Sequence, residues 1–165
     1  MLGVGGAAMA IPYKDIYDAQ NYYMDPWGTN SSRSWTFDIT EDGFNPETQD
    51  VTSASVTLNF SDDKDRRNYT EWALLDVGEN IFLWEVDSGN IGFTLMSTIS
   101  LSETGLVEAD LYSLIGDFYF NTAELYAEGT DLPISAHASE PVSMFMFGSG
   151  LIGVAFLGRK KFGKV

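Results

Sequence analysis

The sequence predicts an all-β fold: an antiparallel β-sandwich, jelly-roll-like, with about seven or eight strands, followed by a C-terminal hydrophobic helix. Three observations support this prediction. Apolar and polar residues alternate over 34–39, 54–60 and 93–101, which is the period of half-buried strands. Clusters of Gly, Asn, Asp and Ser recur roughly every 8–12 residues and indicate turns. No helix longer than about one turn is expected before the tail.

The elements are expected in the following order. Residues 11–32 supply an edge strand near Asp15–Tyr23, or they lie across one sheet. The alternating segments named above form three strands. Further strands are expected in runs rich in aromatic and aliphatic residues, at 70–77, 81–86, 106–111 and 117–126.

The chain of 165 residues has room for one domain of ordinary size, and its ends differ from its middle. Residues 1–10 are small and apolar and end in Ala8-Met9-Ala10, a small-x-small cleavage pattern, so we expect a residual signal peptide there. A flexible Gly/Ala leader is the alternative. The remaining boundaries predict a β-sandwich at 11–129, a linker at 130–138 and a sorting signal with a transmembrane segment at 139–165.

The charge is distributed very unevenly. All 24 acidic residues but only five basic ones precede Val142, which gives that part a formal charge of −19. Such a domain repels nucleic acid and is expected to attract divalent cations. The chain has no cysteine, which excludes a disulfide framework and a thiolate site.

The tail combines three features. Ser139-Glu140-Pro141 precedes an apolar run, Val142–Leu157, and the cations Arg159, Lys160 and Lys161 follow it as a membrane stop. The run would reach only ~24 Å as a helix, against a hydrocarbon core of ~30 Å. The cationic end is expected to stay in the cytoplasm, so that everything upstream lies outside. A buried C-terminal core helix is the alternative.

This layout, with Gly148 to Gly153 inside the apolar run, resembles the PEP-CTERM sorting signal of Gram-negative bacteria that make extracellular polysaccharide. The resemblance implies export to the cell envelope, surface or extracellular matrix, with transient or permanent membrane anchoring. It also implies an exosortase-type processing enzyme as partner. In this sequence Ser139 replaces the usual first proline of the motif, whereas Glu140 and Pro141 match it.

A second resemblance spans about Ser34 to Tyr126. The segment Phe37 to Pro46, the strand near 51–60 and the aspartates after it resemble surface β-sandwich domains often found upstream of PEP-CTERM tails. This resemblance implies architecture and location rather than a biochemical activity.

Clustered carboxylates predict a calcium site, because calcium prefers several hard oxygen ligands in loose geometry. The candidate ligands follow two strands: Asp38, Glu41, Asp42, Asp62, Asp63 and Asp65. The alternative is that these aspartates only solvate turns of an acidic surface.

We expect no enzymatic activity. The single histidine, His137, lies in the expected linker, and no nucleophile or zinc motif is present.

The sequence therefore predicts an exported structural or interaction protein of the cell surface or exopolysaccharide matrix. The alternative function is a calcium-assisted carbohydrate-binding module that contacts extracellular polysaccharide. Its sugar-stacking platform would be Tyr13, Tyr17, Tyr22, Tyr23 and Trp27.

Overall fold

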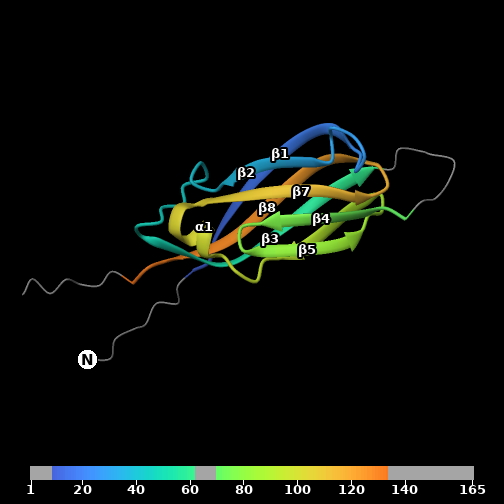
Figure 1. Ribbon diagram of the computed structural model, residues 1–165. Helices are drawn as coiled ribbons and strands as arrows, with labels where there is room; N and C mark the ends of the chain where they lie inside the picture. Colours follow the sequence, from blue (N-terminus) through green and yellow to red (C-terminus); the bar gives the residue numbers. More distant parts are fainter. Residues whose placement is uncertain (1–8, 62–69, 134–165) are drawn as a thin grey trace, which may run out of the picture. The chain divides into compact units, whose positions relative to one another are not determined.

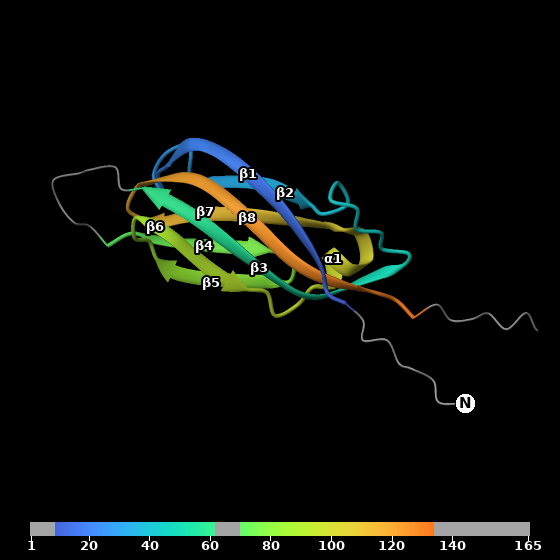
Figure 2. The same cartoon turned by 180° about the vertical axis from the view of Figure 1, so that it is seen from behind.

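The structure, a computed structural model, describes residues 9–61 and 70–133. They form two four-stranded sheets, which face each other in Figure 1 and are seen from behind in Figure 2. Sheet A contains, in spatial order, β1 (Ile11–Met24), β8 (Phe118–Asp131), β3 (Gln49–Ser61) and β6 (Gly89–Thr94). Sheet B contains β2 (Ser32–Asp38), β7 (Leu106–Ile115), β4 (Trp72–Val77) and β5 (Asn80–Glu85). A short helix, α1 (Ile99–Thr104), precedes β7.

The strand order follows one rule. The first strand pairs with the last, the second with the seventh, the third with the sixth and the fourth with the fifth, all antiparallel. The pairs β3–β8 and β4–β7 then join these ladders into two sheets. A long hairpin rolled up in this way is the jelly-roll arrangement. The predicted all-β sandwich is therefore confirmed, while the predicted C-terminal helix lies outside the described residues.

Aromatic rings cross the core between the sheets. Tyr17 of β1 stacks on Trp35 of β2 with ring centroids 5.1 Å apart, and Trp35 lies 5.2 Å from Phe120 of β8. Phe120 lies 5.7 Å from Phe60 of β3, which in turn lies 6.0 Å from Trp84 of β5. Every second side chain of a strand points to the same face of the sheet, and these rings lie at positions that point to the inner face. The alternation expected over 34–39 and 54–60 is confirmed.

The third alternating segment, 93–101, was predicted as one strand, and this is wrong. β6 ends at Thr94, and α1 begins at Ile99. The side chain of Asn80 accepts hydrogen bonds from the backbone N–H groups of Met96 and Ser97, which removes these groups from any ladder. The helix also exceeds the single turn that was expected.

Gly105 ends α1 in the left-handed conformation, with φ of 75°. Its N–H group donates to the carbonyl of Leu101, which is the usual glycine stop of a helix. A Cβ atom at this position would lie 2.4 Å from Thr40 Cγ2, so the site also has no room for a side chain. The glycine thus turns the chain from α1 directly into β7.

The N-terminal segment contributes more than the expected edge strand near Asp15–Tyr23. β1 is 14 residues long and pairs with β8 from Ile11 to Met24. β8 itself continues to Asp131, past the predicted domain boundary at 129. Within 9–61 and 70–133, no helix has the length and apolar character needed to cross a membrane.

Candidate functional site

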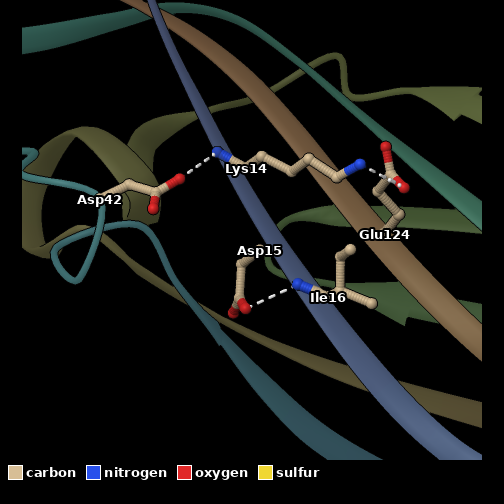
Figure 3. Close-up of polar contacts among 5 residues, drawn as sticks. All are labelled: Lys14, Asp15, Ile16, Asp42 and Glu124. Atoms are coloured by element: carbon tan, nitrogen blue, oxygen red, sulfur yellow. Dashed lines mark hydrogen bonds and ion pairs between the residues drawn. The ribbon is translucent and has the colours of Figure 1, made fainter.

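Two of the three predicted calcium ligands at the end of β2 accept hydrogen bonds from backbone N–H groups. Asp38 Oδ1 accepts hydrogen bonds from Thr40 N at 2.8 Å and from Thr40 Oγ1 at 2.5 Å. Asp42 Oδ2 accepts a bond from Lys14 N at 2.8 Å (Figure 3), and Glu41 is exposed. In the part of the chain that the structure describes, no three His, Cys, Asp or Glu side chains gather as a metal site. The other candidates, Asp62, Asp63 and Asp65, lie outside that part.

Asp15, a neighbour of this turn, has a similar role. Asp15 Oδ1 accepts a hydrogen bond from Ile16 N and its Oδ2 accepts one from Asp38 N, both at 2.7 Å. Lys14 Nζ points away from the turn and forms a 2.9 Å ion pair with Glu124 of β8 (Figure 3). Both ion-pair partners are nearly half exposed, so the pair contributes little to stability.

Of the residues expected to form a sugar-stacking platform, Tyr13, Tyr17 and Tyr22 are engaged in other contacts. Tyr23 is half-buried beside Tyr119, and Trp27 is 91% exposed between β1 and β2. Tyr13 is buried with its ring edge against Phe44, and the half-buried Tyr17 stacks on Trp35 of the core. Arg33 Nε donates to the Tyr17 hydroxyl, and its guanidinium lies 4.7 Å from the Tyr22 ring centroid. Tyr17 and Tyr22 therefore pack around a cation at the β1–β2 edge. The sequence could not reveal this, because it does not place Arg33 beside them.

A cavity of about 490 Å³ on sheet B is lined by several carboxylates. Its lining comes from β4, β7, the β4–β5 turn, the end of α1 and Thr36 of β2. The acidic members are Asp76, Glu79, Glu103, Glu108 and Asp110. Ser100 Oγ donates to Glu79 Oε1 at 2.6 Å and lowers the pKa of that carboxyl below its ordinary value. The cavity can accept hydrogen bonds and attract cations, but it has no histidine in its lining to act as a general base.

Asp76 and Asp110 lie directly opposite each other on β4 and β7. Like charges in such a pair destabilise a sheet. The substitution Asp76→Asn is therefore expected to raise the free energy of unfolding by about 0.5 kcal/mol, and less in high salt. Urea unfolding at low and high ionic strength measures this change. Asp87→Asn, which removes an exposed charge elsewhere, is the matched control; an equal gain there would contradict a local repulsion.

Several apolar residues also lie together on the outer face of sheet B. Leu74 of β4 lies between Leu83 of β5 and Tyr112 of β7 in the register of the sheet. Leu83 is 58% exposed, and the neighbouring Ile81 is 68% exposed. We call this group, together with the exposed Leu114, the sheet B apolar patch. Exposed apolar clusters of this kind are typical of interaction surfaces.

The sorting motif Ser139, Glu140 and Pro141 and the cations Arg159, Lys160 and Lys161 lie outside the described residues. No family model matches the chain, and no curated protein matches it.

Among solved structures, the chain is similar to part of dimeric latent PorU from Porphyromonas gingivalis, with a TM-score of 0.52 and 12% identity. The match covers 80% of this chain but only 14% of PorU. A lower similarity is found with FLHE, with a TM-score of 0.41 and 10% identity over 73% of this chain and 97% of that one. The similarity to Desmodium yellow mottle tymovirus has a TM-score of 0.37 and 8% identity, over 82% of this chain and 95% of that one. At these identities the PorU likeness shows the fold alone, and the other two carry no argument.

Proposed function

We propose that this protein is exported and acts as a structural or interaction component of the cell surface or exopolysaccharide matrix of a Gram-negative bacterium. The observation that carries the proposal is the order of features in the tail: Ser139-Glu140-Pro141, the apolar run to Leu157, then three cations at 159–161. An exosortase-type enzyme would recognise this signal, the apolar run would enter the bilayer, and the cations would halt translocation.

Two features of the folded domain are in keeping with this role. The sheet B apolar patch offers a surface for a partner, and the formal charge of −19 before Val142 keeps the domain away from nucleic acid and anionic lipid. We therefore propose binding rather than catalysis.

Mass spectrometry of the protein recovered from the producing cells tests the proposal. The expected mature species begins near Ile11 and lacks the residues after about Pro141. An intact tail in the surface fraction would show that the tail is not cleaved and that it acts as a permanent membrane anchor. Full-length protein free in the cytosol would refute the proposal.

A further inference from the structure

At one level of sheet A, both ladders that β8 forms are irregular. The register of β1 on β8 shifts between Asp18 and Tyr22, and that of β3 on β8 shifts between Asn59 and Phe60. Both shifts meet at Phe120, which pairs with Tyr22 on one side and with Phe60 on the other. Bulges are common next to binding sites, where they redirect side chains.

The bulge in β1 contains an unusual backbone conformation. Gln20 and Asn21 have φ angles of 58° and 55°, and positive φ is uncommon for residues other than glycine. Both residues are exposed. Strained backbone of this kind clusters at binding sites.

A directed row of side-chain amides crosses the outer face at the same level. Ser61 Oγ donates to Asn121 Oδ1 at 3.3 Å, Asn121 Nδ2 donates to Asn59 Oδ1 at 2.7 Å, and Asn59 Nδ2 donates to Asn90 Oδ1 at 2.5 Å. All three bonds run in the same direction, so each polarises the next. An amide has two N–H groups and two lone pairs, and the row uses one of each on Asn59 and Asn121. The second N–H and the second lone pair of these amides are held in fixed orientation.

Two tyrosines stand beside the row. Tyr23 and Tyr119 are paired in the register of β1 and β8, and Tyr119 is also opposite Ser61. Their ring centroids are 5.4 Å apart, and the Tyr23 hydroxyl donates to Asp117 Oδ2 at 2.5 Å. Both rings are half-buried, which holds them in place and leaves part of each ring accessible. Rigid aromatic rings offer contact area at a low entropic cost.

We propose that this amide–tyrosine row (Asn59, Asn90, Asn121, Tyr23 and Tyr119) binds a neutral polysaccharide. Sugar hydroxyls both donate and accept hydrogen bonds, which matches ordered amides, and the C–H face of a sugar ring packs on an aromatic ring. The row itself carries no charge, and the strongly negative domain around it repels acidic glycans. The proposed contacts are hydrogen bonds from amides and packing on aromatic rings, so we expect this binding not to depend on calcium. The inference rests on the proposed surface location and names a ligand class for it.

The test uses the full chain, purified in a detergent without a sugar headgroup so that the detergent does not compete. The protein is applied to an array of neutral glucose, mannose, galactose and N-acetylglucosamine oligosaccharides, with uronic-acid oligosaccharides as the anionic comparison. We expect binding to neutral members only, unchanged by EDTA. Titration calorimetry with the strongest neutral oligosaccharide gives the affinity.

Three variants locate the site. Asn59→Ala breaks the centre of the row, Asn90→Ala removes its exposed end, and Tyr119→Ala removes a ring. Each is expected to weaken binding about tenfold or more, whereas Tyr119→Phe retains most of it. Tyr126→Ala is the matched control, because Tyr126 is on the outer face of the same strand but away from the row. Melting temperatures show whether each variant is folded. Because Asn90 is exposed, Asn90→Ala is expected to fold and tests the proposal even if another variant does not fold.

The absence of binding to every neutral oligosaccharide would overturn the proposal, as would binding that these variants leave unchanged. Loss of binding in EDTA would assign the activity to a calcium-assisted site elsewhere. Failure of this inference is distinguishable from failure of the proposed function, because the mass of the mature protein reports export and tail processing without any glycan.

Discussion

Phe120→Ala is expected to lower the free energy of unfolding by about 3–5 kcal/mol, within a total of about 5–15 kcal/mol for an ordinary domain. Phe120 is fully buried, and its ring centroid lies 5.2–6.2 Å from the ring centroids of Tyr17, Trp35 and Phe60. These rings come from β1, β2 and β3, so the cavity left by the truncation would affect both sheets. Urea unfolding followed by tryptophan fluorescence measures the loss, since Trp35 reports directly on the site.

Ile16→Ala is the matched control for this result. Ile16 also belongs to a strand of sheet A, but it is 54% exposed and on the outer face. Its truncation is expected to change stability by less than about 0.5 kcal/mol. Equal effects of the two variants would contradict the core that the structure describes.

Asn80→Ala is expected to destabilise the domain by about 2–4 kcal/mol. Asn80 is buried, and its side chain makes four hydrogen bonds to backbone groups. Its amide nitrogen donates to the carbonyls of Val77 and Ser97, and its oxygen accepts from the N–H groups of Met96 and Ser97. Truncation would leave these groups without their partner in a partly buried place, where water replaces it poorly.

Two measurements separate this effect from a general loss of packing. Asn80→Asp keeps the shape and the acceptor oxygen but removes the two donated bonds, so it is expected to be destabilising as well. Hydrogen exchange should accelerate selectively at Met96 and Ser97 in Asn80→Ala. Protection of these two amides as in the unchanged protein would refute the proposed role.

The sequence predicted the sandwich well because burial of alternate residues leaves a local signal. Trp35 and Phe37, like Val56 and Leu58, show the period of two within a single strand. The prediction for the segment after Thr94 was wrong because the contact that decides its structure is distant in the sequence. Asn80 accepts hydrogen bonds from the backbone of Met96 and Ser97, which lie 16 and 17 residues further along the chain. A pattern of apolar residues contains no information about such a contact.

The candidate sites were harder to predict for the same reason. Asp38 and Asp42 looked like ligands in the sequence, but in the fold they accept backbone hydrogen bonds. Asn59, Asn90 and Asn121 are far apart in the sequence and give no local signal. They meet only because β3 pairs with both β6 and β8.

The position of the last strand has a mechanical consequence. β8 lies between β1 and β3 and is hydrogen-bonded to both along most of its length. Tension applied at Asp131 therefore pulls β8 along its own axis and loads many bonds of both ladders together, in shear. An edge strand pulled across its axis would instead open one bond after another. A domain tethered through this strand is suited to bearing load.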